Sequence, residues 1–211
     1  MIKETYSGEA IDELIKFFKL EIDGILHVGA HKCEELNVYL KYIDIKNIVW
    51  VEALKFLVDE NLKKNPDLII INEVVSDQDG TEVEFKIANN TLSSSILEFG
   101  YHAKLHPNVI FNEILKLKTK TLKSIINENN LKNKFNMLTL DIQGAELLAL
   151  MGMGDLLNNL EIIYTEVNEV EIYKGCCIIS DIDSYLNKFN FERKYLNTLN
   201  YYGNALYIKK H

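Results

Sequence analysis

The chain has 211 residues and a formal net charge of −8 at pH 7, and this length suits a single domain with a full central sheet. Hydrophobic residues make up 47% and charged residues 26%, a balance that excludes a disordered chain. The acidic charge and the single arginine, Arg193, argue against a nucleic-acid partner, because phosphate binding needs a basic face.

No apolar run reaches the roughly 18–20 residues of a membrane-spanning helix, and the N-terminus does not resemble a secretion signal. The three cysteines, Cys33, Cys176 and Cys177, lack the C-x-x-C spacing of a zinc site and do not form a disulfide framework. These features together predict a cytoplasmic protein with free thiols.

Predicted helices and strands alternate along the chain, which reads as a single domain over 1–211 with a helical lead-in over 1–23. In its first half we predict a helix over 8–20, a strand over 24–28, a helix over 34–43, a strand over 47–51, a helix over 54–64, and strands over 68–75 and 81–87. In its second half we predict an extended segment over 114–121, a helix over 122–129, a strand over 135–140, a helix over 144–151, a strand over 161–167, a helix over 181–189, and strands over 192–199 and 204–209 joined by a hairpin at 201–203.

Runs such as ILHV, NIVWV and LIII are apolar on both pleats, as strands buried on two faces of a parallel sheet are. The pattern predicts an α/β fold with an open, mostly parallel sheet, an antiparallel last pair of strands, and helices on both faces. The stretch over 88–106 has no period. We predict that 89–106 is a mobile cover over the pocket.

The turn after the first strand contains Gly29 and Ala30, which let a ligand approach the backbone closely. Ligands of open parallel sheets bind at the carboxyl ends of the strands. The turn lacks the G-x-G-x-x-G of a dinucleotide site, and Glu34 and Glu35 would repel a phosphate. It favours a nucleoside that has no phosphates but carries an ammonium and a sulfonium group. His31, in the same turn, is either a base or part of the pocket wall.

Glu52 ends the second strand, 23 residues after Gly29. At that distance an acid can accept both ribose hydroxyls, in NAD and S-adenosylmethionine sites alike, although an acid at a strand end can also be ordinary. Val75 and Ser76, at the end of the third strand, are expected to flank an adenine.

Asp141 and Glu166 lie at the ends of the strands predicted over 135–140 and 161–167. Asp141 is placed to face the ligand's amino group, to orient an acceptor hydroxyl or to bind a cation; its alternative role is to cap the helix that follows. A divalent metal is possible at these strand ends but is not favoured, because such carboxylates also cap helices and bind acceptors.

The stretches HVGAHKCEE, WVEA, NEVVSDQDG, SSSIL, TKTLKSII, LTLDIQGAELLALMGM and IIYTEVNEVEIYKG resemble the FkbM family of S-adenosylmethionine-dependent methyltransferases. The resemblance implies a class I, Rossmann-like fold with an antiparallel last strand and methylation of hydroxyl oxygens on sugars and secondary metabolites. It also implies that Gly29 and Ala30 lie under the methionine end, Glu52 at the ribose, Val75 and Ser76 near the adenine, and Asp141 by the reacting centre. His27 and Cys33 replace the aspartate and the last glycine of the family's usual first turn, and Lys123 replaces the aspartate of its usual T-L-D.

The predicted reaction is an in-line transfer of the sulfonium methyl group to an oxygen of a small-molecule or glycan acceptor. Asp141 is the first candidate to orient or deprotonate that acceptor, followed by Glu166 and His31. The alternatives are an NAD-type oxidoreductase, which needs a phosphate cradle, and a non-catalytic nucleoside-binding module, which does not need Asp141. A nucleic-acid methyltransferase would need a basic channel, and the sequence does not indicate an oligomeric state.

Overall fold

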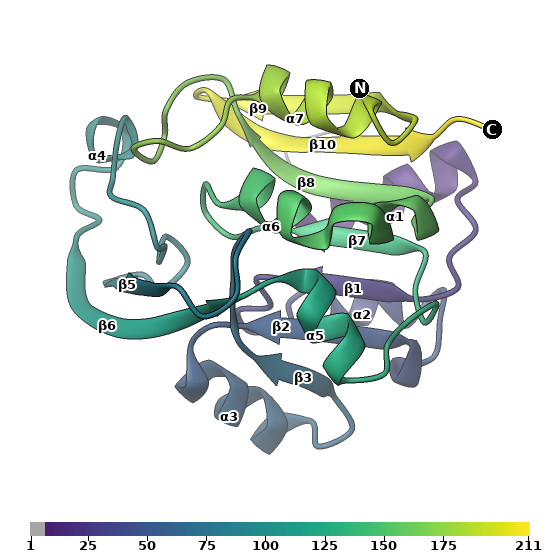
Figure 1. The fold of residues 1–211 in the computed structure, drawn as a ribbon, viewed down its shortest axis with the longest axis horizontal. Coiled ribbons are helices and arrows are strands. Elements are labelled where there is room, and N and C mark those ends of the chain that lie inside the picture. Colours follow the sequence, from purple (N-terminus) through teal and green to yellow (C-terminus); the bar gives the residue numbers. More distant parts are fainter. Residues whose placement is uncertain (1–6) are drawn as a thin grey trace.

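A seven-stranded sheet in the order β3-β2-β1-β7-β8-β10-β9 forms the centre of the computed structural model, which describes residues 7–211 (Figure 1). β10 runs antiparallel to both of its neighbours, and the other paired strands are parallel. The strands are β1 (Ile25–Val28), β2 (Ile48–Glu52), β3 (Ile69–Asn72), β7 (Met137–Leu140), β8 (Ile162–Asn168), β9 (Phe191–Leu199) and β10 (Tyr202–Lys209). The mostly parallel sheet with an antiparallel last strand is confirmed. The part of the expected lead-in over 1–6 lies outside the described residues.

Helices cover both faces of this sheet, which is why β1, β2, β7 and β8 are buried along their whole length. One face carries α1 (Ser7–Phe18) and the short α2 (Leu36–Tyr39), and the other carries α5 (Leu122–Glu128), α6 (Glu146–Met153) and α7 (Ile179–Asn187) (Figure 1). α3 (Lys55–Lys64) packs beside β2 and β3 at the edge, and two short 3₁₀ turns span Ile45–Asn47 and Gly154–Asn159.

The strand expected over 68–75 is broken into two strands that belong to different sheets. β3 ends at Asn72, whose side-chain amide donates to the carbonyl oxygens of Glu52 and Ala53 at 2.8 and 2.9 Å. The chain then turns into β4 (Val74–Val75), which joins β6 (Phe111–Lys120) and β5 (Glu82–Ala88) in a second sheet of order β4-β6-β5. The expected continuous strand is therefore wrong, because Asn72 ends the pairing with β2.

The antiparallel β5–β6 pair and the short α4 (His102–Leu105), which lies in the segment between these two strands, are beyond the carboxyl ends of the central strands, at the left of Figure 1. The segment over 88–106 is mostly a loop, but it contains the short α4 and buries Ser93, Ser94 and Ser95. The closing hairpin turns at Asn200 and Tyr201, with φ of 54° and 75°, so β10 begins two residues before its expected start. No helix in the described part of the chain is both long enough and apolar enough to cross a bilayer.

Candidate active site

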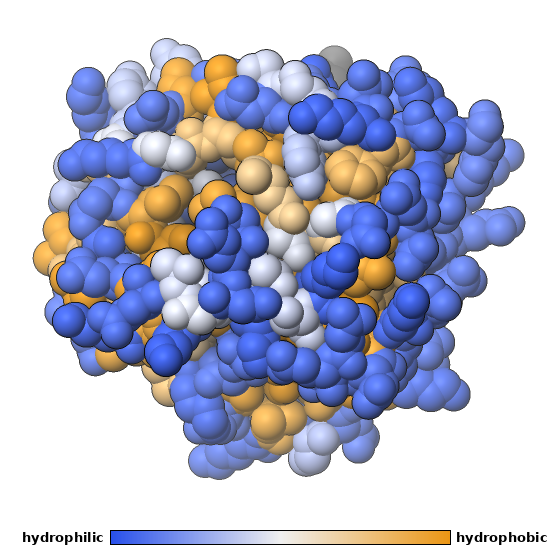
Figure 2. Space-filling view, viewed as in Figure 1, coloured by the Kyte–Doolittle hydropathy of each residue, from blue (hydrophilic) through white to orange (hydrophobic). Residues whose placement is uncertain are grey.

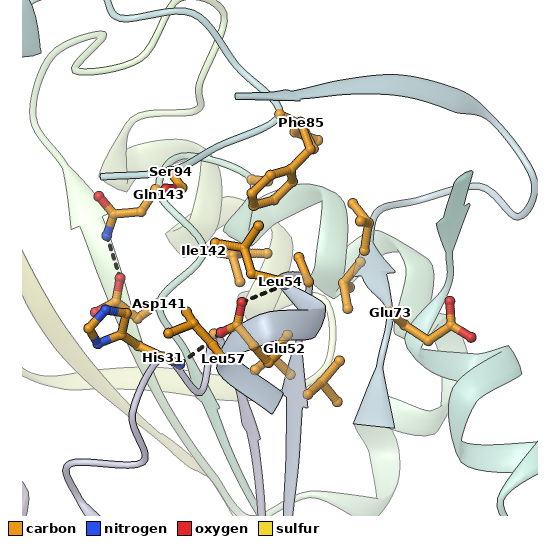
Figure 3. Close-up of a pocket in the computed structure, with 18 of the residues that line it drawn as sticks. His31, Glu52, Leu54, Leu57, Glu73, Phe85, Ser94, Asp141, Ile142 and Gln143 are labelled. Atoms are coloured by element: carbon orange, nitrogen blue, oxygen red, sulfur yellow. Dashed lines mark hydrogen bonds between the residues drawn. The ribbon is translucent and has the colours of Figure 1, made fainter. Parts of the chain in front are cut away.

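Three cavities open at the carboxyl edge of the central sheet. Each is named here after an acid that, among the described residues, lines this cavity and neither of the other two. The Glu52 cavity has a volume of about 600 Å³ (Figure 3), the Glu166 cavity about 1040 Å³ and the Glu35 cavity about 1140 Å³. Four of the residues in 7–211 line all three cavities: Gly29, His31, Leu92 and Asp141. The cavities therefore meet at one junction, which is formed by these four residues.

Gly29 allows the ends of β1 and β7 to approach each other at this junction. Its φ is +90°, and a Cβ atom at this position would lie 1.8 Å from the carbonyl oxygen of Asp141, which no side chain can tolerate. Cys33, which stands where the family usually has glycine, is buried with a φ of 54°. Cys33 thus adopts the left-handed backbone conformation that glycine favours, although it has a side chain.

Glu52 is only 7% exposed, and its carboxylate is held by the backbone. Its Oε1 accepts a hydrogen bond from the Leu54 amide and its Oε2 accepts one from the His31 amide, both at 2.8 Å (Figure 3). Burial raises the pKa of Glu52, while these hydrogen bonds oppose that rise. The carboxylate has further lone pairs that can accept from hydroxyl groups in the cavity.

The rest of the Glu52 cavity is mainly apolar, with Leu54, Leu57 and Val75 in its wall. Figure 3 shows Phe85 of β5 pointing into it toward Ile142. A flat, largely apolar ring fits a cavity of this kind. Ser76 lies outside all three cavities, and its hydroxyl donates to Asp77 Oδ1 at 3.1 Å.

Gln143 lies in the turn after β7, and its side chain hydrogen-bonds both Asp141 and Glu166, the two acids expected at neighbouring strand ends. Its Nε2 donates to Asp141 Oδ1 at 2.5 Å and to Glu166 Oε2 at 3.0 Å. Its Oε1 accepts from the Tyr173 hydroxyl at 2.6 Å. Sequence reasoning assigned no role to Gln143 or Tyr173. The position of Gln143 within the D-x-Q-G-A-E segment could have indicated a role in the site. The sequence around Tyr173 contains no pattern that indicates one.

Glu146, the first residue of α6, binds the backbone amides of the turn that leads into the helix. Its Oε1 accepts from the Ile142 amide at 2.9 Å and from the Gly144 amide at 3.1 Å. The N-cap residue of α6 is Ala145, which offers no side-chain hydrogen bond, so the alternative role of Asp141 as the helix cap is wrong. Glu146 is fully buried, and this burial raises its pKa to about 7.

Asp141 and Glu166 form an acid pair at the floor of the site, of which Glu166 is buried and Asp141 is exposed to the cavities. Asp141 lies deep among protein atoms, yet its side chain lines all three cavities. Burial raises the pKa of Asp141, and the hydrogen bond from Gln143 lowers it in part. Burial, together with the charges of Asp141 and Glu146, raises the pKa of Glu166 well above its usual value. The two acids titrate as a pair, and burial together with their mutual repulsion disfavours the state in which both are ionised.

Both ring nitrogens of His31 are occupied. Nδ1 lies 2.8 Å from Glu34 Oε1 and Nε2 lies 2.9 Å from Thr91 Oγ1. His31 therefore links the Gly29 turn to the 89–106 segment. Within residues 7–211, no three His, Cys, Asp or Glu side chains are grouped so that they could hold a metal ion.

The far wall of the Glu166 cavity is polar and aromatic. His106 Nε2 lies 3.2 Å from the Tyr202 hydroxyl, and His102 Nε2 lies 3.2 Å from Ser93 Oγ. Burial lowers the pKa of His102 to about 4, so its ring is neutral at pH 7. Among the described residues, no lysine or arginine lines any of the three cavities, whereas seven acids do: Glu9, Glu34, Glu35, Glu52, Glu73, Asp141 and Glu166. The site thus suits a neutral or cationic ligand.

The sequence profile of the methyltransferase FkbM domain matches residues 27–201. The chain belongs to the FkbM methyltransferase family. A comparison with curated proteins gives no significant match.

Solved structures with the fold of this FkbM protein include a magnesium protoporphyrin IX methyltransferase from Synechocystis with bound S-adenosylmethionine. It has a TM-score of 0.53 and 8% sequence identity, and the match covers 97% of this chain and 78% of that one. An S-adenosylmethionine-dependent methyltransferase from Clostridium acetobutylicum has a TM-score of 0.53 and 10% identity, covering 97% of this chain and 91% of that one. At these identities the likeness establishes the fold, the class I methyltransferase sheet.

In this FkbM protein, the residues expected at the cofactor are divided among the cavities. Glu52 and Val75 line the Glu52 cavity, and Ala30 lines the Glu35 cavity. His27, which replaces the family's usual aspartate, packs against Trp50 with ring centroids 4.7 Å apart, and its Nδ1 lies 2.9 Å from the Tyr39 hydroxyl. Burial lowers the pKa of His27, so a neutral ring occupies the position of a charged side chain.

Proposed function

We propose that this FkbM protein transfers the methyl group of S-adenosylmethionine to a hydroxyl oxygen of a sugar, a glycan or a small metabolite. The observation that carries the proposal is the junction of the three cavities at Asp141. A donor divided between the Glu52 and Glu35 cavities would present its reactive centre there, and an acceptor in the Glu166 cavity would reach it from the other side.

The side chains of the site fit this methyl donor. S-adenosylmethionine carries an ammonium and a sulfonium group, and the cavities offer carboxylates and no lysine or arginine among the described residues. Glu52 is the acceptor for the ribose hydroxyls, Phe85 and Val75 are apolar neighbours for the adenine, and Gly29 and Ala30 lie under the methionine end. When bound, the donor supplies a methyl group that is already activated by the positive sulfur.

Asp141 accepts the proton of the acceptor hydroxyl as its oxygen attacks. A new C–O bond then forms while the C–S bond breaks, and S-adenosylhomocysteine leaves. Because the donor is activated, the protein mainly has to align oxygen, carbon and sulfur and remove one proton. Leu92, which is 58% exposed and lines all three cavities, covers the reacting centre with an apolar side chain.

The proposal is tested by incubating the protein with methyl-labelled S-adenosylmethionine and a panel of hydroxyl-bearing acceptors. The panel includes methyl glycosides, oligosaccharides and hydroxylated small metabolites, with amine analogues of the same acceptors for comparison. Mass spectrometry should place the labelled methyl group on an oxygen. Transfer to nitrogen alone, or calorimetric binding of NAD in preference to S-adenosylmethionine, would contradict the proposal.

A further inference from the structure

Gln143 has a backbone conformation that residues with a Cβ atom rarely adopt. Its φ is 55°, and that of the following Gly144 is 98°. Outside glycine, such angles persist where the surrounding structure holds them in place. The Ser95 hydroxyl, from the segment over the site, donates to the Gln143 carbonyl oxygen at 2.8 Å.

Both ends of the Gln143 side-chain amide are used. The NH₂ group has two donors, and it gives one to Asp141 and one to Glu166. The reversed amide would place its oxygen against both carboxylates and its NH₂ against the Tyr173 hydroxyl, so the network of partners fixes the orientation. A neutral double donor joins the two acids without adding charge.

We propose that Gln143 is a positioning residue that holds Asp141 and Glu166 together and thereby fixes the Asp141 carboxylate at the junction, beside the donor's sulfonium group. The inference rests on the proposed function, which places the sulfonium there. Leucine at this position would leave both carboxylates without their shared donor. Glutamate would add a further acid to a cluster that already includes Glu146.

The charge of the ligand distinguishes this role from a purely structural one. S-adenosylmethionine has a positive sulfonium, and S-adenosylhomocysteine has a neutral thioether in its place. A carboxylate fixed beside the sulfur favours the first ligand over the second. A residue that only stabilises the fold would affect both ligands alike.

The test is calorimetric titration of the wild-type protein and the Gln143→Leu variant with each ligand. Removal of the hydrogen bonds that hold Asp141 should weaken S-adenosylmethionine binding roughly three- to tenfold more than S-adenosylhomocysteine binding, the range of one net hydrogen bond. Tyr173→Phe keeps the amide but removes the hydroxyl that orients it. It should shift the ratio of the two dissociation constants in the same direction by a smaller factor.

Asn136 supplies the matched control, since its amide also bridges two partners but at the amino edge of the sheet. Its Nδ2 donates to the Glu21 carbonyl oxygen and its Oδ1 accepts from the Asp23 amide, both at 3.0 Å. Asn136→Leu should lower the melting temperature and leave the ratio of dissociation constants unchanged.

Equal weakening of both ligands by Gln143→Leu, or no change, would overturn the positioning role while leaving the proposed function intact. If Gln143→Leu does not fold, the ratio measured with Tyr173→Phe decides, and an unchanged ratio there also overturns the role. A wild-type protein that binds neither ligand would refute the proposed function together with this inference.

Discussion

Replacement of Glu52 by alanine tests whether the acid at the end of β2 binds the ribose. The substitution removes the acceptor for the Leu54 and His31 amides and, in the proposed complex, the acceptor for the ribose hydroxyls. Buried donors without partners cost about 1–3 kcal/mol. We therefore expect Glu52→Ala to weaken ligand binding by a factor between about 5 and 150.

The ribose is uncharged and common to both ligands, so S-adenosylmethionine and S-adenosylhomocysteine should lose nearly the same affinity. This equal loss separates Glu52→Ala from Gln143→Leu, for which the two ligands should differ. Titration calorimetry at 25 °C measures the dissociation constants of both ligands for the wild type and for the variant. These four constants are then compared.

Asp44 provides the control for loss of a backbone-capping carboxylate. Its Oδ1 accepts from the Lys46 amide at 3.1 Å, but it lines none of the three cavities. Asp44→Ala should leave both affinities unchanged. Unchanged affinity in a folded Glu52→Ala variant would remove Glu52 from the ligand site.

Three further predictions concern catalysis, the cover and the acid cluster. Asp141→Asn should keep the fold, because Asp141 is not the cap of α6, but it should slow methyl transfer about 10²-fold or more; full activity in a stable variant would exclude Asp141 as the base. Hydrogen exchange over 89–106 should slow when S-adenosylhomocysteine and acceptor are added, and complete protection without ligand would show that the cover is rigid. The pKa of Glu146 is raised from 4.5 to about 7 in the folded protein, so the native state binds more protons and the free energy of unfolding should fall as pH rises through that window. Glu146→Gln should make this fall shallower in denaturant melts at pH 5, 6 and 7, and an unchanged slope would contradict the assignment.

The central strands could be predicted because their sequences are apolar on both pleats, as in NIVWV, and strands buried on two faces leave this signature. The acids at strand ends could also be found, because parallel strands bring their carboxyl ends to one edge. The break after Asn72 could not, since it depends on side-chain hydrogen bonds to the neighbouring strand. Local sequence patterns also do not predict which residue from a distant part of the chain contacts a turn. This is why the contact of Tyr173 with Gln143 was missed.

The alternative role of Asp141 as a helix cap was wrong for a related reason. Asp141 precedes α6 at a spacing that suits a cap, but its carboxylate is turned toward Gln143 and the cavities. Glu146, the first residue of α6, reaches back to the Ile142 and Gly144 amides in the turn before the helix. The N-cap position itself falls on Ala145, which has no side-chain hydrogen bond. Sequence spacing restricts which residues can cap a helix, but it does not give the path of the turn, which is left-handed at Gln143.

That turn belongs to a group of strained residues that surround the junction. His31, Thr91 and Gln143 have φ values of 41°, 57° and 55°, and all three line the cavities. His31 and Thr91 hydrogen-bond each other, and Gln143 is tied to the same cover segment through Ser95. Strained angles of this kind cost of order 1–3 kcal/mol each and persist only where other contacts hold them. The cover, the first turn and the acid pair therefore stabilise one another, so loss of the His31–Thr91 or Ser95–Gln143 contact should loosen all three together.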